Sequence, residues 1–180
     1  MTSLFPHPPY AEDQPSAHTI LYLHTTRAGA MAGTFIALLT APTAHLVSQY
    51  RHHNPSSTVI STTHTAPTFL LNRVLTHSSR GLLLGALFGA AATYAHMRDR
   101  EEIEWQDRTW RLLENKGEVR TDWVALGGSG VGALMAGEAI RRGLVVGMSG
   151  RMAVFGGAGL GMATGVGYMV GTYVRGRKPA

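Results

Sequence analysis

The sequence predicts an all-α membrane protein, a bundle of four Gly-rich transmembrane helices with an extramembrane helical extension between the second and the third. Four runs of mostly apolar residues approach the length of about 20 residues that a helix needs to cross a bilayer. Each run repeats a small residue at every fourth position. Eight of the 11 acidic residues lie within residues 99–122, so the mean hydropathy of +0.01 averages apolar runs with one strongly charged segment.

Arginine residues mark the borders of the four predicted spans. The spans are residues 28–47 between Arg27 and Arg51, 81–97 between Arg80 and Arg98, 123–140 before Arg141 and Arg142, and 152–174 between Arg151 and Arg175. The predicted domains are a Pro-rich extramembrane segment at 1–25, the transmembrane domain at 26–175 and a basic tail at 176–180. Residues 1–25 contain no Arg or Lys, so we expect no cleaved targeting signal there, but a segment that lies along a partner or stays mobile.

The regular spacing of glycine predicts close helix packing. Within a bilayer there is little hydrophobic force between helices, so a row of small residues brings two backbones together. In water the same glycines would weaken a helix, by about 1 kcal/mol each relative to alanine. We expect the packing residues to be Gly29, Gly33, Gly81, Gly85, Gly89, Gly128, Gly132, Gly157, Gly161 and Gly165.

Two other interpretations of the glycines are less favoured. A soluble protein with Gly-rich loops at 127–171 would not produce four apolar runs that border on arginine and contain between them only one formal charge, Glu138. A nucleotide-binding loop is disfavoured because no strict G-x-G-x-x-G and no G-K-[ST] sequence occurs.

The two long connections between spans are expected to differ in structure. Residues 66–77 predict a short interfacial helix, whereas 99–122 predict a helix that extends the second span into water and ends at Gly117. Opposite charges spaced four residues apart support the second helix. The pairs are Arg100 with Glu104, Glu104 with Arg108, and Asp107 with Arg111. A solvated or partner-facing surface is favoured over acid–base catalysis there, because nothing desolvates the carboxylates.

Ionisable residues near the span ends have alternative interpretations. Glu138 precedes Arg141 and Arg142 at the spacing that allows side chains on one helix to pair, which predicts an intramembrane ion pair near the membrane boundary. The alternatives are that Glu138 makes a buried polar contact or lines a channel. The basic residues Arg175, Arg177 and Lys178 either stop the last span or hold an anionic lipid headgroup. The histidines of the first connection are expected to be solvated rather than metal ligands, since no carboxylate lies near them; they are His52, His53, His64 and His77.

The composition excludes several classes of function. With no cysteine, the chain has no disulfide, thiolate metal site, iron–sulfur centre or cysteine nucleophile. The basic residues border apolar runs and form no continuous face, so a nucleic-acid partner is not expected. We expect no catalytic residue, no cofactor and no metal.

The four Gly-rich spans and an ordered set of polar and small residues resemble the mitochondrial Tim translocase superfamily. That family places an Arg, then an Asp, ahead of glycines at the start of its third span, and here Arg120, Asp122, Gly127, Gly128 and Gly132 have that order with shorter spacing. The chain is most similar to the family's respiratory branch, the Tim-like accessory subunit of complex I as found in fungi.

The resemblance implies a non-catalytic, multi-pass accessory subunit of NADH:ubiquinone oxidoreductase in the mitochondrial inner membrane. Such a subunit of the respiratory electron-transport chain would assemble and stabilise the membrane arm. The implied partners are other membrane-arm subunits, phospholipid with cardiolipin as one candidate, and complex III in a supercomplex. The alternative is a component of an inner-membrane protein translocase. A small-solute transporter is less favoured, because the spans offer few polar residues at mid-depth.

Overall fold

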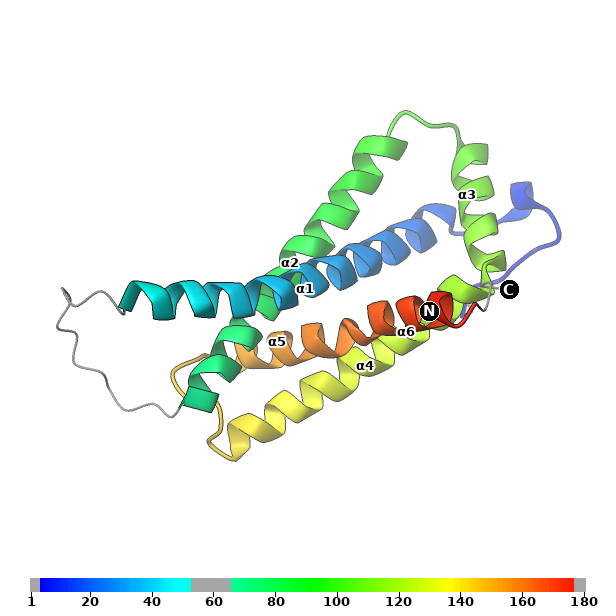
Figure 1. Cartoon of the computed structure of the whole chain (residues 1–180). Coiled ribbons are helices and arrows are strands. Elements are labelled where there is room, and N and C mark those ends of the chain that lie inside the picture. The colour runs from blue at the N-terminus through cyan, green and yellow to red at the C-terminus, as the bar shows by residue number, and fades with distance from the viewer. Residues whose placement is uncertain (1–3, 53–65, 177–180) are drawn as a thin grey trace.

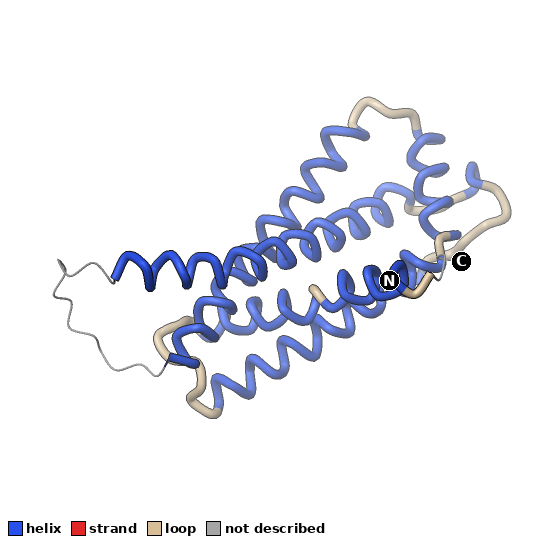
Figure 2. The backbone as a smooth tube through the Cα atoms, in the orientation of Figure 1, coloured by secondary structure: helices blue, strands red, loops and turns tan. Residues whose placement is uncertain are grey.

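The computed structural model describes residues 4–52 and 66–176, and every regular element in these ranges is helical (Figure 2). The prediction of an all-α fold is therefore confirmed. The elements are the short 3-10 helix η2 (Ala11–Asp13) and the helices α1 (Ala17–His52), α2 (Ala66–Met97), α3 (Glu102–Glu114), α4 (Lys116–Arg141), α5 (Gly150–Met162) and α6 (Thr164–Val174).

The long helices α1, α2 and α4 and the consecutive helices α5 and α6 make up the bundle (Figure 1). Helices α1, α2 and α4 are single rods, while α5 and α6 lie almost in line and are interrupted only at Ala163. The α1–α2 and α4–α5 pairs are the two most extensive contacts, so the fold is two hairpins joined along α2 and α5. Helix α3 lies across one end, where the N-terminal segment and the end of α6 also lie (Figure 1).

Two helices extend beyond the predicted spans. Helix α1 begins at Ala17, inside the segment predicted to be extramembrane, because Ala17 and Ile20 are buried there. Helix α2 runs without a break from Ala66, so the prediction of a separate interfacial helix at 66–77 is wrong. This first part of α2 continues the helix because Leu75 and Ser78 are buried against α5.

The charged segment 99–122 is divided between two helices instead of extending α2. A turn after Met97 separates α2 from α3, and α3 ends at Glu114. Asn115 then starts α4, because its side-chain oxygen accepts hydrogen bonds from the backbone amides of Gly117 (3.1 Å) and Glu118 (3.2 Å). Gly117 therefore lies in the first turn of α4, and the prediction that it ends a helix is wrong.

Helix α3 and the N-terminal segment form a cap on the bundle. Trp105 is 4% exposed and packs with Ala17 and Met97, while Thr109 donates a hydrogen bond to the carbonyl of Ala17 (3.0 Å). The indole of Trp110 donates to the carbonyl of Pro8 (2.9 Å). One face of α3 is thus buried within the chain, where an exposed helix was expected, and the described part of the N-terminal segment packs on this same chain.

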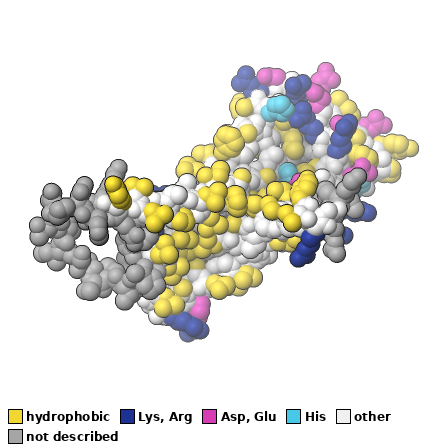
Figure 3. All heavy atoms as spheres, viewed as in Figure 1, with side chains coloured by type: hydrophobic (Ala, Val, Ile, Leu, Met, Phe, Trp, Pro, Cys, Tyr) yellow, Lys and Arg dark blue, Asp and Glu magenta, His cyan; other side chains and the backbone are white. Residues whose placement is uncertain are grey.

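Large apolar side chains remain exposed between the two ends of the bundle. Figure 3 shows charged side chains gathered around α3 and at the opposite tip, with hydrophobic side chains over the face between them. Among the described residues, two stretches are long and apolar enough to cross a membrane, Lys116–Arg141 and Gly150–Val174. Only 11% of the apolar window of the first is buried, so most of this apolar surface faces outward from the chain.

Candidate functional site

The first hairpin is closed by glycines on both helices. Gly29 and Gly33 of α1 face the row of three glycines on α2. A Cβ added to Gly85 would overlap the carbonyl oxygen of Gly29 and lie 3.0 Å from the Cα of Gly33. Gly81 and Gly89 are equally close to the backbone of α1. These five positions, which the sequence singled out, form one continuous seam.

The second hairpin has the same construction. Gly128 and Gly132 of α4 lie against Gly157 and Gly161 of α5, and a Cβ at any of the four would overlap a backbone carbonyl oxygen of the opposite helix. Gly165 has a different environment, because its added Cβ would lie 2.7 Å from the sulfur of Met31 and 2.8 Å from the Cβ of Ala125. It therefore joins α6 to both α1 and α4.

A third glycine contact joins the two hairpins and was not predicted. A Cβ on Gly156 would overlap the carbonyl of Leu75, and one on Gly159 would lie 2.7 Å from the hydroxyl of Ser78 and 2.7 Å from a methyl carbon of Thr34. Helix α5 thus presents small residues on two faces. The doublet of Gly156 and Gly157 is the sequence signal for this, since adjacent helical residues point in different directions.

A buried ion cluster links α1 to α4 at the end nearest α3. Arg27 Nε lies 2.6 Å from Asp122 Oδ1, and the two side chains are 3% and 0% exposed. His24 Nδ1 lies 3.7 Å from the same carboxylate oxygen. Glu118 Oε2 lies 3.8 Å from Arg27 Nη2, at the more exposed side of the cluster. From the sequence, Arg27 was predicted to lie at a span border and Asp122 belonged to the family signature, but no ion pair between them was predicted.

The cluster serves best as a connection between helices. Breaking one member of a buried pair leaves an uncompensated charge, so the pair fixes how α1 and α4 meet. The ligand atoms of His24, Glu118 and Asp122 lie within 4.8 Å of one another, a spacing that would suit a metal ion. The guanidinium of Arg27 already supplies positive charge to this group. We therefore interpret the cluster as an ion-pair latch.

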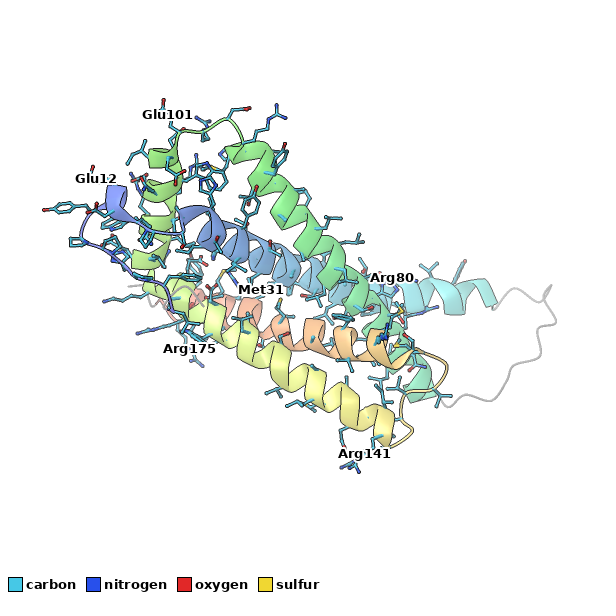
Figure 4. All side chains as sticks on the ribbon, turned by 180° about the vertical axis from the view of Figure 1, so that it is seen from behind. Glu12, Met31, Arg80, Glu101, Arg141 and Arg175 are labelled. Carbon is cyan, nitrogen blue, oxygen red and sulfur yellow. The ribbon has the colours of Figure 1, made fainter. Side chains whose placement is uncertain are left out.

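The predicted pair at the other end of α4 is present. Arg141 binds both carboxylate oxygens of Glu138, each at 2.7 Å, and Arg142 Nε donates to Glu138 Oε1 at 2.6 Å. Figure 4 shows Arg141 at the tip of the bundle, far from Glu101 and Arg175. The carboxylate of Glu138 is partly exposed at the end of its helix and lines no part of the groove described below.

The remaining predicted site residues are dispersed. Arg175 is exposed just after α6, and Arg177 and Lys178 lie outside the described residues. Of the histidines of the first connection, His77 is in α2 and His52 is the last residue of α1. His53 and His64 lie outside the described residues.

Comparison with known proteins places the chain in a family. No curated protein and no solved structure matches it. One family model, described as "Protein of unknown function (DUF1757)", matches residues 11–169. The matched range runs from η2 into α6 and includes the glycine seams and the ion-pair latch. The chain therefore belongs to the DUF1757 family.

Proposed function

We propose that this chain is a non-catalytic accessory subunit of mitochondrial NADH:ubiquinone oxidoreductase, spanning the inner membrane as a four-helix bundle. The resemblance described above supplies the identity of the complex. The observation that carries the proposal is the distribution of side-chain size, because the bundle packs small residues inside and turns large apolar residues outward.

The apolar surface requires a cover. The seams are sealed by glycine backbone, and the large side chains of the same helices face outward. The exposed ones include Ile36, Leu39, Leu83, Leu84, Leu87, Phe88, Val131, Leu134, Met135 and Val170. A water-soluble monomer rarely exposes so extensive an apolar surface, whereas a membrane protein must. Lipid and neighbouring membrane subunits are the covers that fit.

The polar features lie at a spacing that suits a bilayer. On α4, Asp122 in the latch and Arg141 at the tip are separated by a helical rise of about 28 Å, close to the bilayer core of about 30 Å. The cap formed by α3 lies beyond the latch end, and both described ends of the chain lie there as well (Figure 1). Four crossings with both chain ends on one side account for this arrangement.

The position of Arg80 supports a cover of protein as well as lipid on α2. It is exposed, and among the described residues it has no hydrogen-bond or ion-pair partner. It lies next to Gly81, which packs on Gly33 near the middle of α1, so it is far from both ends of the bundle (Figure 4). An arginine at the centre of a bilayer helix costs about 2.5–3.5 kcal/mol. A carboxylate or carbonyl of a neighbouring subunit would remove this cost.

Native electrophoresis of gently solubilised mitochondrial membranes tests the proposal. With this chain tagged and NADH dehydrogenase activity stained in the same lane, we expect comigration with the active complex. The variant Arg80→Gln should reduce comigration. The control variant Arg98→Gln should not, because Arg98 is exposed and paired with Asp99 (3.0 Å) outside the apolar surface.

A different migration pattern would overturn the proposal. If the tagged chain migrates in a smaller assembly without NADH dehydrogenase activity and captures arriving precursor proteins, the chain is a translocase component. If comigration persists in Arg80→Gln, the chain is an accessory subunit but docks through another face.

A further inference from the structure

A groove opens between α1 and α2 on the side of the hairpin nearest α3. Its volume is about 720 Å³, within the range of about 300–1,000 Å³ that small-molecule sites occupy. Along α1 it is lined from Leu21 to Ile36, a helical rise of about 22 Å. It is therefore long and open, and it exceeds the depth of one bilayer leaflet, about 15 Å of hydrocarbon.

The chemistry of the groove changes along its length. Its inner part is apolar, with Ile36, Leu84 and Phe88 above the glycine seam. Its outer part carries His96 at the end of α2 and Arg108 from α3. No carboxylate lines the groove in the described part of the chain. The groove thus has an apolar channel with a basic mouth.

Arg108 is available at this mouth. The sequence predicted that Glu104 would pair with it, but Glu104 instead accepts from Arg100 (3.2 Å) and from the backbone amide of Glu101 (3.3 Å). Asp107 is bound by Arg111 (3.0 Å). Arg108 therefore has no acidic partner among the described residues, and its side chain lines the groove.

We propose that this groove binds an anionic phospholipid, with one acyl chain on the glycine seam and the phosphate at Arg108 and His96. The apolar length fits a chain that descends through one leaflet, and the uncompensated arginine matches an anionic headgroup. The helix α3 holds the arginine at the level where the headgroup lies. The inference depends on the proposed membrane location, but not on membership of complex I.

Native mass spectrometry of the full chain, purified in mild detergent, tests the site. The probes are phosphatidylglycerol and phosphatidylcholine with identical acyl chains, so that only headgroup charge differs. Because one basic residue near a lipid surface contributes about 1 kcal/mol, Arg108→Gln should bind phosphatidylglycerol about fivefold more weakly. The matched control Arg111→Gln removes a charge from the same helix outside the groove and should bind as the wild type does.

A second pair of variants tests the acyl channel. Ala92 lines the groove and Ala91 does not, although both are exposed on α2. Ala92→Phe should reduce binding of both lipids, and Ala91→Phe should leave it unchanged. Equal binding of the two lipids by the wild type, or unchanged binding by Arg108→Gln and Ala92→Phe, would overturn the site. Neither outcome affects comigration with complex I, so the two proposals fail independently.

Discussion

Alanine at two neighbouring glycines of α4 should have opposite effects on stability. Gly132 lies in the seam, where an added Cβ would overlap the carbonyl oxygen of Gly157 and lie 3.0 Å from the amide nitrogen of Gly161. Gly130 is on the same helix, and its added Cβ meets nothing within 4 Å. The substitutions Gly132→Ala and Gly130→Ala are therefore chemically identical and differ only in what the new methyl group touches.

The expected difference in the free energy of unfolding between the two variants follows from two terms. Alanine improves the helix over glycine by about 0.5–1 kcal/mol at both positions. Overpacking a close contact costs about 1–3 kcal/mol, and here the obstacle is backbone, which cannot rotate away. The helix term cancels when the two variants are compared. Gly130→Ala should therefore be more stable than Gly132→Ala by about 1–3 kcal/mol, or about 5- to 150-fold in the unfolding equilibrium.

Pulse proteolysis of the full chain across a titration of sodium dodecyl sulfate in dodecylmaltoside measures this difference. We expect the unfolding midpoint of Gly132→Ala to fall below that of the wild type and that of Gly130→Ala to exceed it. Equal midpoints for the two variants would refute the conclusion that the α4–α5 seam is held by backbone contact.

Three further predictions have defined outcomes. Asp122→Asn should lower the free energy of unfolding in the same titration by about 3–5 kcal/mol, because it leaves the buried Arg27 without its carboxylate partner. Glu118 is partly exposed, so Glu118→Gln should cost under about 1 kcal/mol. Equal losses for the two variants would contradict the latch. Trp105→Ala should cost about 3–5 kcal/mol and expose the N-terminal segment to protease, and unchanged protection would contradict the cap. Glu138→Gln should change neither stability nor comigration with complex I; loss of precursor transport would instead favour the translocase.

The seams could be predicted because they depend on spacing alone. A small residue at every fourth position forms a flat strip on any helix, and antiparallel neighbours in a hairpin bring two such strips together. The pairing of Gly29 with Gly85 and of Gly128 with Gly161 follows from this rule. The contact of Gly156 with Leu75 does not, because it joins helices from different hairpins and depends on how the hairpins are rotated against each other.

The helix boundary at Asn115 was missed because two local signals compete. Gly117 resembles a helix stop, but the side chain of Asn115 accepts two amide hydrogen bonds and so begins a helix before the glycine is reached. The latch was missed for another reason. Arg27 and Asp122 are far apart in sequence, and each lies beside an apolar run, where a charge ordinarily indicates solvent.

Arg80 shows the physical limit of assigning span borders from charge. The rule assumes that an arginine beside an apolar run lies at the membrane surface. The contacts of α2 contradict this here, since Gly81 meets Gly33 and Ala37 in the middle of α1 while Gly89 meets Thr25, near the level of the latch. The apolar runs 28–47 and 81–97 are therefore offset along the hairpin and cannot both be centred in one bilayer. In the proposed bilayer, an offset of this kind places Arg80 within the apolar surface, where an unpaired arginine is costly unless its side chain reaches the membrane interface or a polar partner.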